Sequence, residues 1–158
     1  MSNQTPVIIL KLLVSSLLIL PCWLLAETHE TDVYTVEYPD DWRVERIDRE
    51  TSRIALYPSD TFTRLQIAAR NLDDILMVSQ EWLREYTRLD PAIELEYENW
   101  GELGGFNYQY EVRLQQRRTW WLTDGRQVLM ATFSTSMDDS LDSFQADIER
   151  IIRSINLK

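Results

Sequence analysis

The ten residues from Phe106 to Gln115 alternate without exception between apolar and polar side chains. The apolar members are Phe106, Tyr108, Tyr110, Val112 and Leu114. Because successive side chains of a strand point to opposite faces of a sheet, the pattern predicts a strand with one face in a core. A chain with such a strand has to fold around a sheet, and this constrains every other segment.

Other segments have strand character, because they alternate in the same way or are rich in β-branched and aromatic residues. They are residues 33–38, 42–47, 53–57, 63–71, 93–100, 117–123 and 127–135. Asp124-Gly125 separates the last two and is a strong signal for a two-residue hairpin turn. Short turns between successive strands favour an antiparallel sheet.

Two segments change to helical spacing, with apolar residues recurring every three or four positions. We predict helices over residues 73–89 and 140–155. The apolar stripe of the second helix, which contains Phe144, Ile148 and Ile152, is expected to cover the apolar face of the Phe106–Leu114 strand. The sequence therefore predicts an α+β fold with an antiparallel β-sheet sandwiched by helices, an α/β/α arrangement.

The first 26 residues have the pattern of a secretion signal. Lys11 precedes an apolar run, Pro21 ends the run, and Ala26 stands before the first acidic residue, Glu27. We expect cleavage after Ala26 and a mature protein in the periplasm. Acylation of Cys22 is one alternative, and retention of residues 7–26 as an uncleaved anchor is another, although Lys11 would be costly inside a bilayer.

The rest of the chain reads as one unit. Residues 27–32 are polar and are expected to form a flexible lead-in, and residues 33–158 to form a single domain. The formal net charge is −10, which argues against binding to nucleic acid and against docking on anionic lipid headgroups. The one cysteine, Cys22, lies in the leader, so no disulfide or thiol chemistry is expected in the domain.

Catalytic and metal-binding patterns are weak in this sequence. The one histidine, His29, lies in the expected lead-in, which leaves no base for a Ser-His-Asp site. The acids at 138, 139 and 142 suit a helix N-terminus better than a calcium loop. Glutamates on the strands are more often a solvated face than a glycosidase pair. We expect no enzyme activity, no cofactor and no metal.

Two features are candidates for an interaction site. Glu94, Glu96 and Glu98 recur at period two, so they are expected to form an acidic row on one strand face. If Arg113, Arg117 and Arg118 pair with this row, it is structural. If they do not, the row is a target for a basic partner.

The other candidate is Trp120-Trp121, whose rings should point to opposite faces of a strand. One reading leaves Trp121 exposed near Arg117 and Arg118, which suits a protein interface. The other reading has a helix covering the second face and burying both rings.

The order of elements resembles the PsbP-like superfamily, which also contains the Ran-binding nuclear-import factor of yeast and bacterial envelope proteins of the DcrB type. The residues that carry the resemblance are Tyr38-Pro39 followed by Trp42, the Gly101-x-x-Gly104-Gly105 turn, the Asp124-Gly125 hairpin and Ile151-Ile152-x-Ser154-Ile155. The resemblance covers residues 33–157. It implies an α/β/α sandwich and an accessory, chaperone or binding role without catalytic residues.

These observations lead us to interpret the chain as a non-catalytic bacterial envelope protein that binds another protein as an accessory or assembly factor. Two alternatives remain. Small size, export and acidity also suit an immunity protein that neutralises a basic secreted toxin. A binder of a lipid or other apolar ligand would need a cavity between sheet and helix.

Overall fold

The computed structural model describes residues 26–58, 62–70, 78–139 and 141–158. The expected secretion signal, including Cys22, lies outside the described residues apart from Ala26. The strands are β1 (Ala26–Glu30), β2 (Tyr34–Pro39), β3 (Arg43–Asp48), β4 (Arg53–Tyr57), β5 (Arg64–Arg70), β6 (Glu96–Trp100), β7 (Leu103–Val112), β8 (Gln115–Thr123), β9 (Val128–Ser136) and β10 (Asn156–Leu157). The helices are α1 (Gln80–Thr87), the short 3₁₀ helix η1 (Leu141–Ser143) and α2 (Gln145–Arg153).

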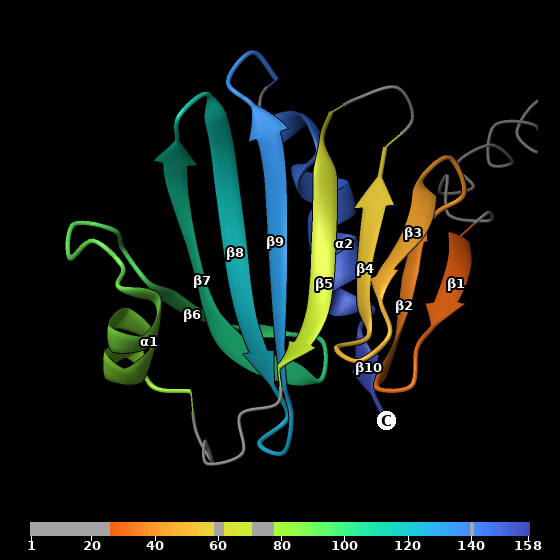
Figure 1. Cartoon of the computed structure of the whole chain (residues 1–158), viewed down its shortest axis with the longest axis horizontal. Helices are drawn as coiled ribbons and strands as arrows, with labels where there is room; N and C mark the ends of the chain where they lie inside the picture. The colour runs from red at the N-terminus through yellow and green to blue at the C-terminus, as the bar shows by residue number, and fades with distance from the viewer. Residues whose placement is uncertain (1–25, 59–61, 71–77, 140) are drawn as a thin grey trace, which may run out of the picture.

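The strands form two antiparallel sheets. The large sheet has seven strands in the order β3-β4-β5-β9-β8-β7-β6, so β3 and β6 are its edges (Figure 1). The small sheet has three strands in the order β1-β2-β10. The protein is therefore an α+β fold built mostly of antiparallel strands with two short helices, which confirms the sheet type predicted from the alternation. None of the helices in the described ranges has the length and apolar character needed to cross a lipid bilayer.

The larger core lies between α2, β2 and the face of the large sheet that carries Leu65, Trp120 and Phe133. The buried α2 side chains in this core are Ile148, Ile151 and Ile152. Figure 1 places α2 behind the middle of the large sheet. Burial of these aliphatic side chains is the main contribution that holds the helix there.

A second, smaller cluster lies on the opposite face of the large sheet, beside α1. It is built around Val78, Leu83, Tyr108, Trp121 and Val128. Phe106 and Tyr110 pack against it from β7. The apolar face of β7 therefore points toward α1, and the prediction that the α2 stripe covers it was wrong. Alternation shows that a strand has an apolar face, but it does not show which helix covers that face.

The far end of the same alternating segment also differs from expectation. β7 ends at Val112, and Arg113 has a φ of 57°, which turns the chain into β8. Leu114 lies in this turn and is 80% exposed. The predicted strand was too long because the turn residues Arg113 and Leu114 happen to continue the polar and apolar alternation of the strand.

The helix boundaries differ as well. Residues 73–77 of the first expected helix lie outside the described residues, and residues 78 and 79 are not helical. α1 begins at Gln80, where the Ser79 hydroxyl accepts a hydrogen bond from the Trp82 N–H at 3.2 Å and caps the helix. The second helix is divided into η1 and α2.

The lead-in predicted to be flexible contains β1. Residues Ala26–Glu30 pair with Pro39–Thr35 of β2, and Glu27 Oε2 accepts a hydrogen bond from the Tyr38 hydroxyl at 2.8 Å. Lys158 Nζ lies 2.7 Å from Glu30 Oε1, so the last residue of the chain also contacts β1. Main-chain pairing orders this strand although it contributes little to the core.

Candidate interaction surface

The acidic row expected at 94, 96 and 98 is not present as a row of three. Glu94 precedes β6, so only Glu96 and Glu98 lie on that strand. Glu98 Oε1 lies 2.8 Å from Arg153 Nη2, at the end of α2. Within the described ranges, Glu94 and Glu96 are exposed and belong to no ion pair.

The arginines considered as neutralising partners, Arg113, Arg117 and Arg118, form no ion pair with this row in the described structure. β7 lies between β6 and β8, so Arg117 and Arg118 are two strand spacings from it, roughly 10 Å. Arg117 donates to Gln115 Oε1 from Nε at 3.3 Å and from Nη2 at 2.8 Å. Arg113 lies in the turn after β7.

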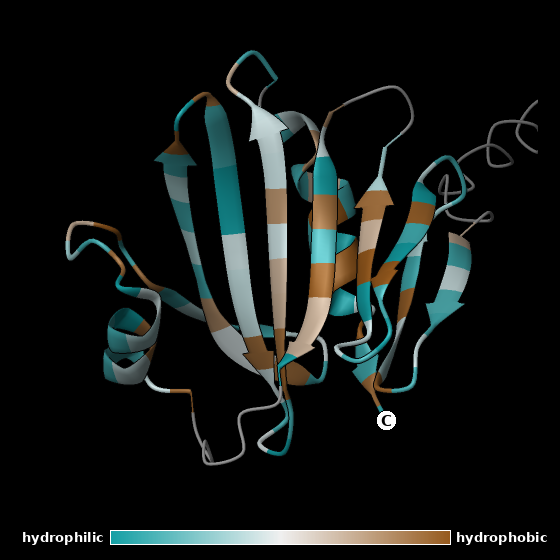
Figure 2. Ribbon diagram, viewed as in Figure 1, coloured by the Kyte–Doolittle hydropathy of each residue, from teal (hydrophilic) through white to brown (hydrophobic). Residues whose placement is uncertain are grey.

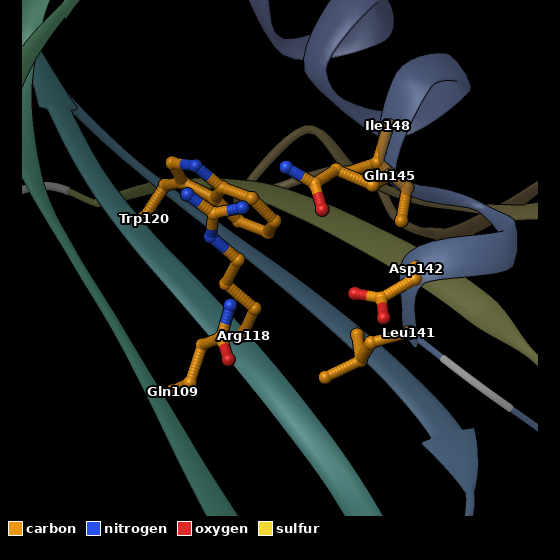
Figure 3. Close-up of a pocket in the computed structure, with 7 residues that line it drawn as sticks. All are labelled: Gln109, Arg118, Trp120, Leu141, Asp142, Gln145 and Ile148. Atoms are coloured by element: carbon orange, nitrogen blue, oxygen red, sulfur yellow. The ribbon is translucent and has the colours of Figure 1, made fainter.

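Arg118 lies at a shallow pocket on the α2 side of the sheet, with an empty volume of about 250 Å³ that includes open solvent (Figure 3). The pocket is lined by Gln109, Arg118, Trp120, Leu141, Asp142, Gln145 and Ile148. The Arg118 guanidinium lies 5.0 Å from the centroid of the Trp120 ring and 5.6 Å from that of Trp100.

The same guanidinium is held by polar groups on two elements. Its Nε and Nη2 donate to Asn107 Oδ1 at 3.1 and 2.9 Å, and Nη1 lies 3.6 Å from Glu149 Oε1 of α2. Arg118 therefore joins β7, β8 and α2, and its charge is used within the fold.

Trp121 is 2% exposed, so it is not available as an exposed interface residue. Its ring makes edge contacts with Trp82 and Tyr86 of α1, with centroid distances of 5.8 and 5.6 Å. Trp120 is also buried, on the opposite face. Of the two readings of the Trp120-Trp121 pair, the structure supports the one in which both rings are buried. Burial also raises the pKa of the neighbouring Tyr108.

Part of the large sheet that faces away from α2 is uncovered in the described structure. α1 lies beside β6 and β7, whereas no described helix lies over β4, β5 and β9 on this side (Figure 1). We call this surface, which extends over β3, β4, β5, β9 and the first half of β8, the open face. Strand register gives its charged residues as Arg43, Glu45, Asp48, Arg53, Arg64, Arg70 and Arg117.

Uncharged polar residues lie between these arginines. Gln66, Thr132 and Thr119 are neighbours across β5, β9 and β8, and the hydroxyls of Thr132 and Thr119 lie 3.3 Å apart. Figure 2 shows hydrophilic bands along β5 and at the start of β8. The open face is therefore mostly polar, although Ala55, Ala68 and Met130 also lie on it, in contrast to the face that packs against α2.

Each arginine of the open face lacks an ion-pair partner within the described part of the chain. Arg43 lies over the Tyr57 ring, 5.1 Å from its centroid, and Arg70 Nη2 lies 3.5 Å from Met130 Sδ. Arg70 Nε is buried and has no hydrogen-bond partner among the described residues. Among the described residues, five arginines against one glutamate and one aspartate thus give a positive surface on a chain whose formal net charge is −10. Such a surface attracts anionic groups.

Of the arginines on the open face, only Arg117 was among the candidate residues predicted from the sequence. Arg43, Arg53, Arg64 and Arg70 are spread over three strands, and each alternates with core residues of its own strand. Alternation alone could have assigned each to a solvent side. Only the pairing of the strands shows that they share one surface.

Groups of three or more His, Cys, Asp or Glu side chains placed to hold a metal ion do not occur among the described residues.

Two solved structures are similar to this chain. The solution structure of cyanobacterial PsbP (CyanoP) from Synechocystis sp. PCC 6803 aligns with a TM-score of 0.54 and 12% identity, over 84% of this chain and 92% of that one. A crystal structure from Bacteroides thetaiotaomicron VPI-5482 aligns with a TM-score of 0.56 and 13% identity, over 79% of this chain. The match spans only 45% of that longer protein.

No family model matches the sequence. No curated protein matches it either. The structural likeness establishes the fold: this chain has a PsbP-like fold, as the resemblance in its sequence implied.

Proposed function

We propose that this chain is a non-catalytic protein of the bacterial envelope that binds another protein, as an accessory or assembly factor, through the open face. The observation that carries the proposal is the set of five arginines that share this face without a carboxylate partner in the described structure. The core that holds the sheet to α2 lies on the other side, so packing gives no reason for these charges. A partner with acidic groups would supply the missing counter-charges and would associate faster for that reason.

The proposal includes export. We propose cleavage after Ala26 and a location in the periplasm, with acylation of Cys22 or retention of the leader as the alternatives. Cleavage there would leave Glu27–Glu30 in place to pair with β2, together with the contact between Glu27 and Tyr38. The cut would therefore leave the fold intact.

The proposal also includes the finer architecture expected from the sequence, in which helices form the outer layers of an α/β/α sandwich. The contacts of α2 with one face of the large sheet and of α1 with the other support it. In this arrangement α1 leaves the middle of its face open for a partner.

Site-specific cross-linking in the bacterium that encodes the protein tests this function. A photoreactive side chain would replace Gln66 on the open face or, as a matched control, the exposed Gln109 on the opposite face. We expect a discrete protein adduct from position 66 and none from position 109. A third position, Glu96, tests the alternative of a basic partner at the β6 edge. Adducts from position 96 and not from 66 would contradict the proposal.

Periplasmic fractionation with N-terminal sequencing tests the location. We expect a product that begins at Glu27 in the periplasmic extract. A full-length product in the cytosol would contradict export, and a lipid-modified Cys22 would replace cleavage after Ala26 with anchoring.

A further inference from the structure

Three apolar side chains are exposed at one end of the large sheet. Phe62 is 100% exposed, Leu114 is 80% exposed and Met137 is 41% exposed. Single exposed apolar residues are common on protein surfaces. These three instead come from three separate segments: the start of β5, the turn between β7 and β8, and the end of β9.

Hydrogen bonds show that these segments are adjacent. The Met137 N–H donates to the Leu114 carbonyl oxygen at 3.1 Å. The hydroxyls of Thr63 and Thr135 lie 2.9 Å apart, which aligns the start of β5 with the end of β9. Figure 1 shows the start of β5, the end of β9 and the β7–β8 turn at the same end of the sheet. We call Phe62, Leu114 and Met137 the apolar tip.

The apolar tip is continuous with the open face through two arginines. Arg64 pairs with Ser134 from one side, and Arg117 pairs with Ser134 from the other. Their α-carbons are therefore about two strand spacings apart, roughly 10 Å. Arg64 lies two residues after Phe62, and Arg117 lies three residues after Leu114. A cationic pair thus lies next to the exposed apolar tip in the fold, and exposed apolar residues rimmed by polar ones are typical of an interaction site.

We infer that the partner presents an acidic protein segment with apolar side chains. Its carboxylates bind the guanidinium groups of Arg64 and Arg117, and its apolar side chains cover the apolar tip. This inference rests on the proposed function and names the chemistry of the partner. Guanidinium groups bind carboxylates with paired hydrogen bonds, so each arginine can fix the position of one acid.

Charges near the apolar tip favour a protein segment over a membrane. Glu111, near the end of β7, and Asp138, just after the end of β9, are both exposed. Asp139 follows Asp138 in the chain and accepts a hydrogen bond from the Ser136 hydroxyl at 3.0 Å. An anionic lipid surface would meet these carboxylates together with the arginines, whereas a protein segment can place its acids over the arginines alone.

Binding of short synthetic peptides to the exported protein tests the inference. One probe alternates Glu and Leu, a second alternates Glu and Ser, and a third alternates Gln and Leu. We expect the Glu/Leu peptide to bind roughly tenfold more tightly than either of the others, because only it provides both contacts. The double variant F62S/L114S should reduce its affinity to that of the Glu/Ser peptide. Ile47→Ser, at an exposed apolar residue of β3 that lies away from the tip, should change neither.

Three results would overturn the inference. Equal binding of the Glu/Leu and Glu/Ser peptides, with loss of both in R64Q/R117Q, would remove the apolar tip from the site but leave the proposed function standing. Binding of no acidic peptide in wild type or variant would count against the proposed function itself. Binding to phosphatidylglycerol vesicles but not to phosphatidylcholine vesicles, lost in F62S/L114S, would identify the tip as a membrane contact. Circular dichroism of each variant controls for folding.

Discussion

Arg153 Nη2, at the C-terminal end of α2, lies 2.8 Å from Glu98 Oε1 on the edge strand β6. Arg153 Nη1 also donates to the Asn99 carbonyl oxygen at 2.9 Å, and its guanidinium lies 4.7 Å from the centroid of the Trp100 ring. Gly101, with a φ of 66°, follows in the turn, where an added Cβ would lie 2.5 Å from the Arg153 carbonyl oxygen. The C-terminal end of α2 is therefore held against the edge strand β6 by the contacts of Arg153, which we call the α2–β6 contact. Glu98 is part of this contact.

From the α2–β6 contact we predict that substitutions of its two charged residues, Glu98 and Arg153, lower the free energy of unfolding by different amounts. Glu98→Gln removes one exposed ion pair and should lower the free energy of unfolding by less than about 1 kcal/mol. Arg153→Ala also removes a hydrogen bond and the contact with Trp100, so we expect a loss of about 1–2 kcal/mol. Urea denaturation at neutral pH measures both. Equal losses would show that the contacts of Arg153 other than the ion pair contribute nothing.

The core beneath α2 predicts a difference between two residues of its apolar stripe. Ile152 is fully buried, so Ile152→Ala should lower the free energy of unfolding by about 2–5 kcal/mol. Phe144 is only half-buried and contacts Phe133 at a centroid distance of 5.8 Å, so Phe144→Ala should cost less than Ile152→Ala. Thermal or urea denaturation ranks the two. The reverse order would contradict the placement of α2.

His29 predicts a pH dependence of stability. Partial burial on β1 lowers its pKa below the ordinary 6.5, and the nearby Arg46 lowers it further. Because the unfolded chain binds this proton first as the pH falls, the contribution of neutral His29 is present above about pH 6.5 and is lost as the pH falls through the folded pKa.

Carboxylates titrate in part of the same range, so His29→Gln is the reference for this prediction. The stability of the wild type minus that of His29→Gln should decrease as the pH falls from about 7.5 to about 5. A difference that is constant over this range would contradict burial of the imidazole.

The sequence predicted the strands of the large sheet better than it predicted β1. The alternation of β7 and the Asp124-Gly125 hairpin are local signals, and both correspond to antiparallel pairing in the structure. β1 gave no such signal, since Glu27–Glu30 contains no aliphatic residue. Pairing with β2 and the contact of Glu30 with Lys158 order it, and both partners are distant in sequence.

The candidate site depended even more on long-range pairing. Arg64 and Arg117 are 53 positions apart in the sequence, yet both lie opposite Ser134. The acidic row could be predicted from the sequence because its members are close together in the chain. α2 reaches that row from the end of the chain, which no local pattern indicates.

The cross-link at position 66 in charge-reversed variants measures most directly whether the open face binds an acidic partner. The test variant is R64E/R117E, and the control is R49E/R126E, which makes the same charge change at exposed residues of the β3–β4 and β8–β9 turns, at the other end of the sheet from Arg64 and Arg117 (Figure 1). We expect the adduct from position 66 to disappear in R64E/R117E and to persist in R49E/R126E, with unchanged circular dichroism. An adduct of equal yield in all three proteins would contradict a role of the open-face arginines in binding.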